Sequence, residues 1–194
     1  MEMINTNLDE GKILIRREEE LLTDNLKVGD VIWFTLENGE EVEAMAMKKE
    51  DDGMIFAFVD CLKKPMPMKW DNRDLNDWLN YDLYPMFPEK ARSIMKPFKD
   101  GSMLRLMSIK EVFGKTYFGA VDEEDAEQFE PMKNRKNRVA GHGKNGCEDE
   151  YANWWLRSVR SGTAFCVVAS HGLAGASDAS ASLGVRPAFK ISIS

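Results

Sequence analysis

The chain has 194 residues, of which 43% are hydrophobic and 30% are charged, and its formal net charge is −7. This size and composition predict a folded protein rather than a disordered one, and the acidic balance excludes nucleic acid as the expected partner. No apolar run reaches the ~18 residues that a membrane-spanning helix needs, and the start of the chain lacks the basic and apolar segments of a signal peptide. We therefore expect synthesis in the cytoplasm, with a virion or a cell surface as candidate final locations.

The chain is expected to divide into an N-terminal extension, residues 1–24, and one domain, residues 25–194. The extension is polar and charged. Its order is left open, because residues 13–22 suit either a short strand and helix or a loose arm.

The domain is predicted to begin with an antiparallel meander. Two turn signals, Asn38-Gly39 and Asp52-Gly53, separate segments rich in β-branched and aromatic residues. Asn-Gly suits a two-residue hairpin turn because both residues tolerate positive φ. The three predicted strands are residues 31–36, 41–47 and 54–59.

Two helices are predicted in the centre of the chain. Apolar residues recur at helical spacing from Leu75 to Leu83, and Pro85 is expected to end this helix. A second helix is expected to begin at Pro88 and to end before Pro97.

A strand at residues 103–107 is expected to lead into a third, short helix. Ser108 and Glu111 have the spacing of a capping box, in which each residue satisfies a backbone N–H group of the other. A long polar loop, residues 122–150, then carries an acidic start and a basic cluster. We interpret this cluster as a solvated face, with phosphate contact as the alternative. Its members are Lys133, Arg135, Lys136 and Arg138.

The C-terminal part is predicted to return to strands. Residues 163–169 form a predicted strand and residues 170–172 a turn, and a run of small side chains follows. The last strand begins at Val185. Pro187 lacks an amide donor, so we expect this strand at an edge or at a bulge.

Candidate catalytic and metal-binding residues are scarce. His142 and His171 lack the spacing of zinc sites, and both are interpreted as exposed and inert. The three cysteines form no CxxC pair and predict no disulfide framework. We expect no catalytic residue, no metal ion and no cofactor.

Two C-terminal stretches carry a family resemblance. Residues 153–158, NWWLRS, and residues 184–189, GVRPAF, resemble the WWLRS and GVRPA signatures of a bacterial and phage domain family, often left as a domain of unknown function. Residues 70–80 resemble its W…S-x-L-R-x-W-L-N helix, and residues 28–33 its opening strand. The family is related to the formylglycine-generating-enzyme type of C-type lectin fold. The resemblance therefore implies a mixed α+β, C-type lectin-like fold with antiparallel strands and two central helices, in which the first and last strands lie close together.

The resemblance also implies a site. Some members of this wider fold are variable proteins of diversity-generating retroelements, in which adenine-directed mutagenesis rewrites a C-terminal stretch. An AAC codon mutated at its adenines encodes small residues, His, Leu and others, but never a stop. Within the candidate variable segment, residues 159–183, eight residues are reachable in this way and are expected to be exposed on one face. These display positions are Ala169, His171, Leu173, Gly175, Ala176, Ser177, Ala181 and Leu183.

A rigid frame is expected beneath the display positions. Its scaffold residues are Trp154, Trp155, Arg157 and Arg186. The two tryptophans, together with Val185 and Phe189, should be buried. The two arginines should be held by carboxylates or carbonyls.

The function implied is non-enzymatic binding of an unknown protein or cell-surface ligand. The chain lacks the C-terminal cysteine pair of the formylglycine-generating enzymes, and residues 130–132 lack the third ligand of the calcium-lectin triplet. Both departures weigh against a metal-dependent function. The alternatives are an enzyme or a sugar-binding module of the formylglycine-generating branch, or a structural phage or surface component.

Overall fold

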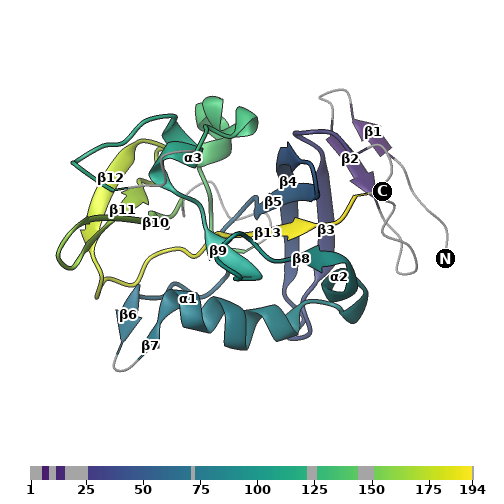
Figure 1. The fold of residues 1–194 in the computed structure, drawn as a ribbon, viewed down its shortest axis with the longest axis horizontal. Helices are drawn as coiled ribbons and strands as arrows, with labels where there is room; N and C mark the ends of the chain where they lie inside the picture. Colours follow the sequence, from purple (N-terminus) through teal and green to yellow (C-terminus); the bar gives the residue numbers. More distant parts are fainter. Residues whose placement is uncertain are drawn as a thin grey trace.

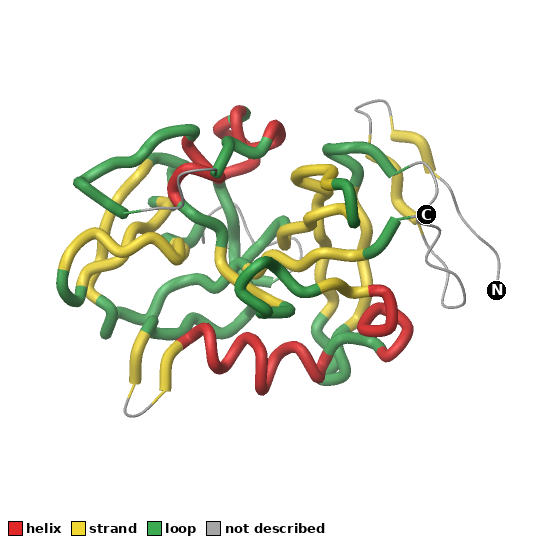
Figure 2. Tube along the Cα trace, viewed as in Figure 1, coloured by secondary structure: helices red, strands yellow, loops and turns green. Residues whose placement is uncertain are grey.

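A computed structural model describes most of the domain and two strands before it. The described residues are 6–8, 12–15, 26–70, 73–121, 126–143 and 151–193. The helix considered for residues 16–22, the acidic run 122–125 and Cys147 lie outside them. The fold combines antiparallel sheets with short helices, as Figures 1 and 2 show, and the mixed α+β class is thereby confirmed.

The larger sheet has the strand order β1-β2-β3-β4-β5-β13-β8, and β9 also pairs with β13. Its strands are β1 (Thr6–Leu8), β2 (Lys12–Ile15), β3 (Val31–Thr35), β4 (Glu41–Glu50), β5 (Gly53–Phe58), β8 (Met95–Lys96), β9 (Leu104–Leu106) and β13 (Pro187–Ile191). The predicted meander is confirmed, because β3, β4 and β5 pair antiparallel in chain order. From the extension, β2 adds to this sheet parallel to β3.

The β3–β4 hairpin has a longer turn than the sequence predicts. Thr35 pairs with Glu41, so residues 36–40 form the connection. Gly39 adopts a φ of 83° and donates its N–H to the Leu36 carbonyl at 2.8 Å. Leu36 is buried, and its N–H donates to the Glu40 carbonyl at 2.9 Å, which joins the two ends of the connection.

The central strands are buried on both faces. Every residue of β5 and β13 is buried, and successive side chains alternate between two hydrophobic clusters. Phe56 and Phe189 stack with ring centroids 5.6 Å apart, and Phe34 meets Phe189 edge-on at 6.0 Å. The first and last strands of the domain therefore meet in one core, as expected.

The prediction that Pro187 lies at an edge or a bulge is wrong. It begins β13, which lies between β5 and β9 inside the sheet. Pairing with β5 starts only at Ala188, opposite Ala57. The missing amide donor of proline is tolerated because the first residue of a strand needs no partner on that side.

Three short α-helices lie between β7 (Arg73–Asp74) and β10 (Trp154–Ser161) in the described part of the chain. α1 (Leu75–Trp78) continues through the π-helical turn η1 (Leu79–Leu83) into the 3-10 turn η2 (Tyr84–Met86), and this helical run lies along the bottom of Figure 1. Pro85 therefore lies inside η2 rather than ending the run, because the first N–H groups of a helical turn need no partner within it. α2 is Glu89–Ile94. α3 (Ile109–Phe113) has both bonds of the predicted capping box.

A smaller sheet contains residues 154–158 of the first signature stretch. Its order is β10 (Trp154–Ser161), β11 (Ala164–Val168) and β12 (Ala174–Asp178). It lies on the opposite side of the molecule from β1 and β2 in Figure 1. The 3-10 turns η3 (Glu130–Lys133) and η4 (Arg135–Arg138) precede it in the chain. A two-stranded ribbon, β6 (Lys69–Trp70) with β7 (Arg73–Asp74), completes the described elements.

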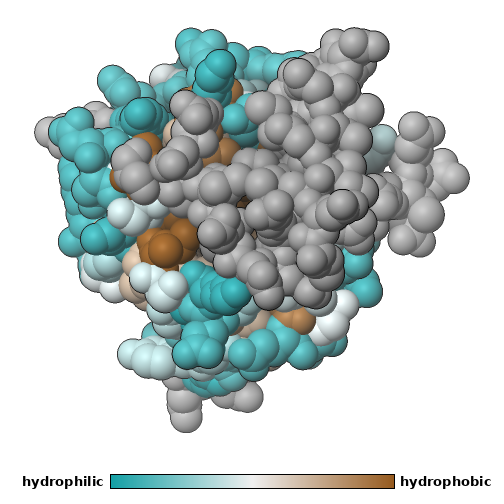
Figure 3. Space-filling model, turned by 90° about the vertical axis from the view of Figure 1, so that its right-hand side faces the viewer, coloured by the Kyte–Doolittle hydropathy of each residue, from teal (hydrophilic) through white to brown (hydrophobic). Residues whose placement is uncertain are grey.

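The surface near β1 and β2 is shown in Figure 3. On this face the described residues are mainly hydrophilic, with separate hydrophobic patches among them. Scattered apolar side chains of this kind are normal on a folded protein.

Candidate functional site

The display positions lie on the turn between β11 and β12, on β12, and on the return to β13. None of the eight is buried: His171 and Leu173 are exposed, and the other six are half-buried. The two leucines differ, because Leu173 is 46% exposed whereas Leu183 packs with Ala181 against the core. The segment therefore has an exposed turn and a more sheltered end.

Along β12 the display positions do not share one face. The register sets Gly175 opposite Val167, Ala176 opposite Cys166 and Ser177 opposite Phe165. Paired residues of antiparallel strands point to the same side, and successive residues point to opposite sides. Ala176 therefore lies on the face away from Gly175 and Ser177, which differs from the single face that we expected.

The turn before β12 is held by contacts from outside the segment. Asn153 accepts a hydrogen bond from the Ser170 N–H at 2.8 Å through its side-chain oxygen. Arg135 donates its Nε–H to the His171 carbonyl at 2.7 Å. Gly172 closes the turn with a φ of 80° and donates to the Ala169 carbonyl. These bonds fix the turn without using the side chains of its display positions.

Both signature tryptophans are fully buried, as are Val185 and Phe189. The indole of Trp154 donates to the Arg138 carbonyl at 2.9 Å, and the indole of Trp155 donates to the Met66 carbonyl at 2.8 Å. Each ring therefore combines apolar burial with a satisfied N–H group.

The two signature arginines have the partners that the sequence analysis expects. Arg186 is buried, donates to the carbonyls of Phe58 and Asn137, and lies over the Trp154 ring at 4.9 Å. Burial lowers the pKa of Arg186 to about 10, which leaves the guanidinium charged at neutral pH. Arg157 lies 3.8 Å from the carboxylate of Glu111.

The glycine of the second signature is required by close packing. The Gly184 N–H donates to the Asn153 carbonyl, and the Gly184 carbonyl accepts from the Trp155 N–H, so the two signatures are joined directly. A Cβ at this position would lie 2.5 Å from the sulfur of Cys61, which is itself buried.

We expect Gly184→Ala to lower the free energy of unfolding by ~1–3 kcal/mol, because overpacking forces neighbouring groups out of place. Urea denaturation measures the loss. The control is Gly175→Ala, whose Cβ would lie 3.1 Å from a methyl group of Val167 and 4.0 Å from the nearest backbone atom. Gly119→Ala does not serve as a control, because the positive φ of Gly119 would strain an alanine whatever the packing. A smaller loss in Gly184→Ala than in Gly175→Ala would contradict this reading.

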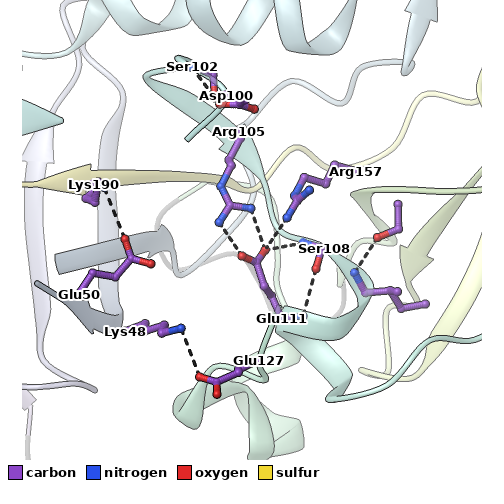
Figure 4. Close-up of polar contacts among 12 residues, drawn as sticks. Lys48, Glu50, Asp100, Ser102, Arg105, Ser108, Glu111, Glu127, Arg157 and Lys190 are labelled. Carbon is purple, nitrogen blue, oxygen red and sulfur yellow. Dashed lines mark hydrogen bonds and ion pairs between the residues drawn. The ribbon is translucent and has the colours of Figure 1, made fainter. Parts of the chain in front are cut away.

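A buried polar cluster joins α3 to β9 and β10 (Figure 4). Glu111 accepts two hydrogen bonds from Arg105, at 2.9 and 2.5 Å, and one from the Ser108 N–H at 2.7 Å. Ser158 accepts from the Ile109 N–H through its hydroxyl at 2.8 Å. The signature residues Arg157 and Ser158 are thus both directed at α3. The capping-box pattern identifies Glu111, but only the tertiary structure brings the arginines to it.

Two pockets flank this cluster, and Asp100 and Arg105 line both. The larger, about 240 Å³, lies between the start of α1, β9, β10 and Phe165. The smaller, about 100 Å³, opens towards Lys48 and Lys190. Partial burial alone would raise the pKa of Asp100, but hydrogen bonds from Ser102 outweigh it, so the pKa is lowered and the carboxylate stays charged. Three ion pairs lie in the lining of the smaller pocket: Lys48 with Glu127, Arg105 with Glu111, and Lys190 with Glu50.

The two histidines lie in different surroundings. His171 is exposed, and His142 is half-buried with its Nδ1 atom 3.0 Å from the Leu62 carbonyl, so only the first matches the expectation that both are exposed. Burial raises the pKa of the Cys61 thiol to about 12, so it stays protonated at neutral pH. Among the residues that the structure describes, no group of three His, Cys, Asp or Glu side chains is placed to hold a metal ion. No described helix is long and apolar enough to cross a membrane.

Comparison with known proteins adds one similarity. The model of a family described as a domain of unknown function, DUF6273, matches residues 102–193. This stretch contains both signatures and all eight display positions. Searches of curated proteins and of solved structures find no match.

Proposed function

We propose that this chain is a non-enzymatic ligand-binding protein, a retroelement-diversified variable protein that displays its segment on a C-type lectin-like scaffold. The observation that carries the proposal is the contrast in burial between segment and frame. None of the eight display positions is buried, whereas Trp154, Trp155, Val185 and Arg186 on either side of them are almost wholly inaccessible to solvent.

This contrast is what a rewritable surface requires. A large-to-small change in a core costs ~2–5 kcal/mol, whereas exposed substitutions usually change stability by less than ~0.5 kcal/mol. A protein with ~5–15 kcal/mol of stability tolerates repeated change best at the second kind of position. His171 and Leu173 are of this kind, and the six half-buried display positions lie between the two kinds. Leu183 and Ala181 are the most restricted display positions, because both pack against the core.

The side chains of this variant suggest modest affinity from the display positions alone. They are small apart from His171, Leu173 and Leu183, and binding hot spots are usually Trp, Tyr or Arg. Another variant of the same scaffold would bind a different partner through larger side chains at the same places.

The tolerance is testable with a library randomised at the eight display positions. We expect most members to stay folded, as measured by resistance to protease on a display platform, and some to bind immobilised test proteins. A matched library randomised at eight buried positions of β10, β11 and β13 should lose its fold. A display library that unfolds as often as the buried one would refute the assignment of surface and scaffold.

The retroelement origin has a separate test in the neighbouring DNA. We expect a reverse transcriptase gene and an imperfect repeat of the 3′ end of the coding sequence. Their absence would leave a ligand-binding domain without a diversification system, and that part of the proposal would fall.

A further inference from the structure

The basic cluster in the loop before β10 contacts the turn between β11 and β12. We call this turn, residues 169–173, the display turn. We call Lys133, Arg135, Lys136 and Arg138 the basic rim. Arg135 donates to the His171 carbonyl at 2.7 Å, and a Cβ on Gly172 would lie 3.0 Å from the Arg135 carbonyl oxygen. Arg135 therefore contacts the turn directly, and the other three residues of the rim lie within three positions of Arg135 in the chain.

The rim is fixed by the same residues that frame the segment. The Arg138 carbonyl accepts from the Trp154 indole at 2.9 Å, and the Asn137 carbonyl accepts from Arg186 at 2.8 Å. Asn134 caps η4 by accepting from the Lys136 N–H at 3.0 Å. The signature residues thus hold the backbone of η4, the turn that carries Arg135, Lys136 and Arg138.

The charge is available to a partner. Lys133, Arg135 and Lys136 are exposed, and Lys133 is partly neutralised by Glu130 at 2.5 Å. Burial lowers the pKa of Arg138, and the nearby positive charge of Arg135 acts in the same direction despite an opposing effect of Tyr117. Arg138 itself is half-buried, with its guanidinium over the Phe113 ring at 5.0 Å, so the other three residues carry the exposed charge. The rim is therefore a local positive surface on a chain whose net charge is −7.

We propose that the basic rim, His171 and Leu173 form one docking surface for an acidic protein partner, with the rim as its invariant part. The inference rests on the proposed display function and names the class of its partner. Complementary charge would steer and orient the partner, while the display positions supply the selective contacts. Leu173, 46% exposed beside the rim, favours a protein over a nucleic acid, because it offers an apolar contact that a phosphate backbone does not use.

The test measures binding of the intact chain to three fluorescent probes: a short peptide of repeated Glu-Leu-Asp-Ser, its Lys-Leu-Arg-Ser counterpart, and a single-stranded oligonucleotide. We expect the acidic peptide to bind at least roughly tenfold more tightly than the basic one, and to weaken as salt is raised, because exposed charges are screened. Equal binding of the two peptides, no binding of the acidic peptide, or tighter binding of the oligonucleotide would each overturn the proposal.

Charge reversal locates the effect. The double variant Lys133→Glu with Lys136→Glu leaves the Arg135–His171 bond in place. It should weaken the binding of the acidic peptide by roughly tenfold or more. The matched variant Lys49→Glu with Lys99→Glu reverses two exposed charges, one on β4 and one in the turn between β8 and β9, and should bind as the unmodified chain does. If the rim variant bound the acidic peptide as before and the display library still folded, the role of the rim would be overturned and the display function would stand. A rim effect with a library that unfolds would instead remove the display function and leave a fixed site for acidic proteins.

Discussion

Replacing Trp154 by alanine is expected to lower the free energy of unfolding by ~3–5 kcal/mol, the cost of a large cavity in a core. Trp154 is fully buried, supports the Arg186 guanidinium at 4.9 Å and donates to the Arg138 carbonyl. Its loss therefore removes packing below the smaller sheet and frees η4. Urea denaturation followed by tryptophan fluorescence and by circular dichroism measures the change.

The matched control is Leu173→Ala, which removes a large apolar side chain from the display turn. Because Leu173 is 46% exposed, we expect a change within ~0.5 kcal/mol. If Leu173→Ala destabilised the protein more than Trp154→Ala did, the scaffold and the display surface would have been assigned the wrong way round.

Removing the carboxylate of Glu111 is the second large effect that we expect. Glu111→Ala leaves the buried guanidinium of Arg105 and the nearby guanidinium of Arg157 without this shared counter-charge, and breaking a buried ion pair costs ~3–5 kcal/mol. It also removes the acceptor for the Ser108 N–H and so half of the capping box of α3. The free energy of unfolding, measured with urea, should fall accordingly.

Two further variants separate charge from packing. Glu127→Gln breaks an exposed ion pair with Lys48 at 3.3 Å and should cost at most ~1 kcal/mol. Combining Glu111→Leu with Arg105→Met should recover part of the loss, since an apolar pair can replace a buried ion pair. A double variant less stable than Glu111→Ala would mean that the geometry of the cluster, and not its charge balance, stabilises α3.

Residues of both signature stretches make specific contacts besides the packing of the two tryptophans. In the first signature, Asn153 holds the display turn, Trp154 and Trp155 fill the core, and Arg157 and Ser158 face α3. In the second, Gly184 permits close contact with Cys61, and Arg186 joins β5 to η4. Each conspicuous residue of the two motifs therefore has a physical task around the segment.

The amino-acid sequence by itself determined the local elements of this protein. Segments rich in β-branched and aromatic residues, with turn signals between them, located β3, β4 and β5. Helical spacing located α1, and the Ser108–Glu111 spacing located the α3 cap. These features depend on neighbours within a few residues, and local propensity and capping are therefore sufficient to predict them.

Only the tertiary structure decided how those elements meet. The sequence could not place Pro187 inside the sheet, because strand order depends on contacts between distant segments. It could not divide the display positions between the two faces of β12, because that division follows from the register with β11. Nor could it bring the basic rim to His171, since a hydrogen bond across 36 residues joins a loop interpreted as a solvated face to the turn that carries the candidate site. Contacts between residues distant in sequence form when the chain buries its shared core, and local sequence patterns do not predict them.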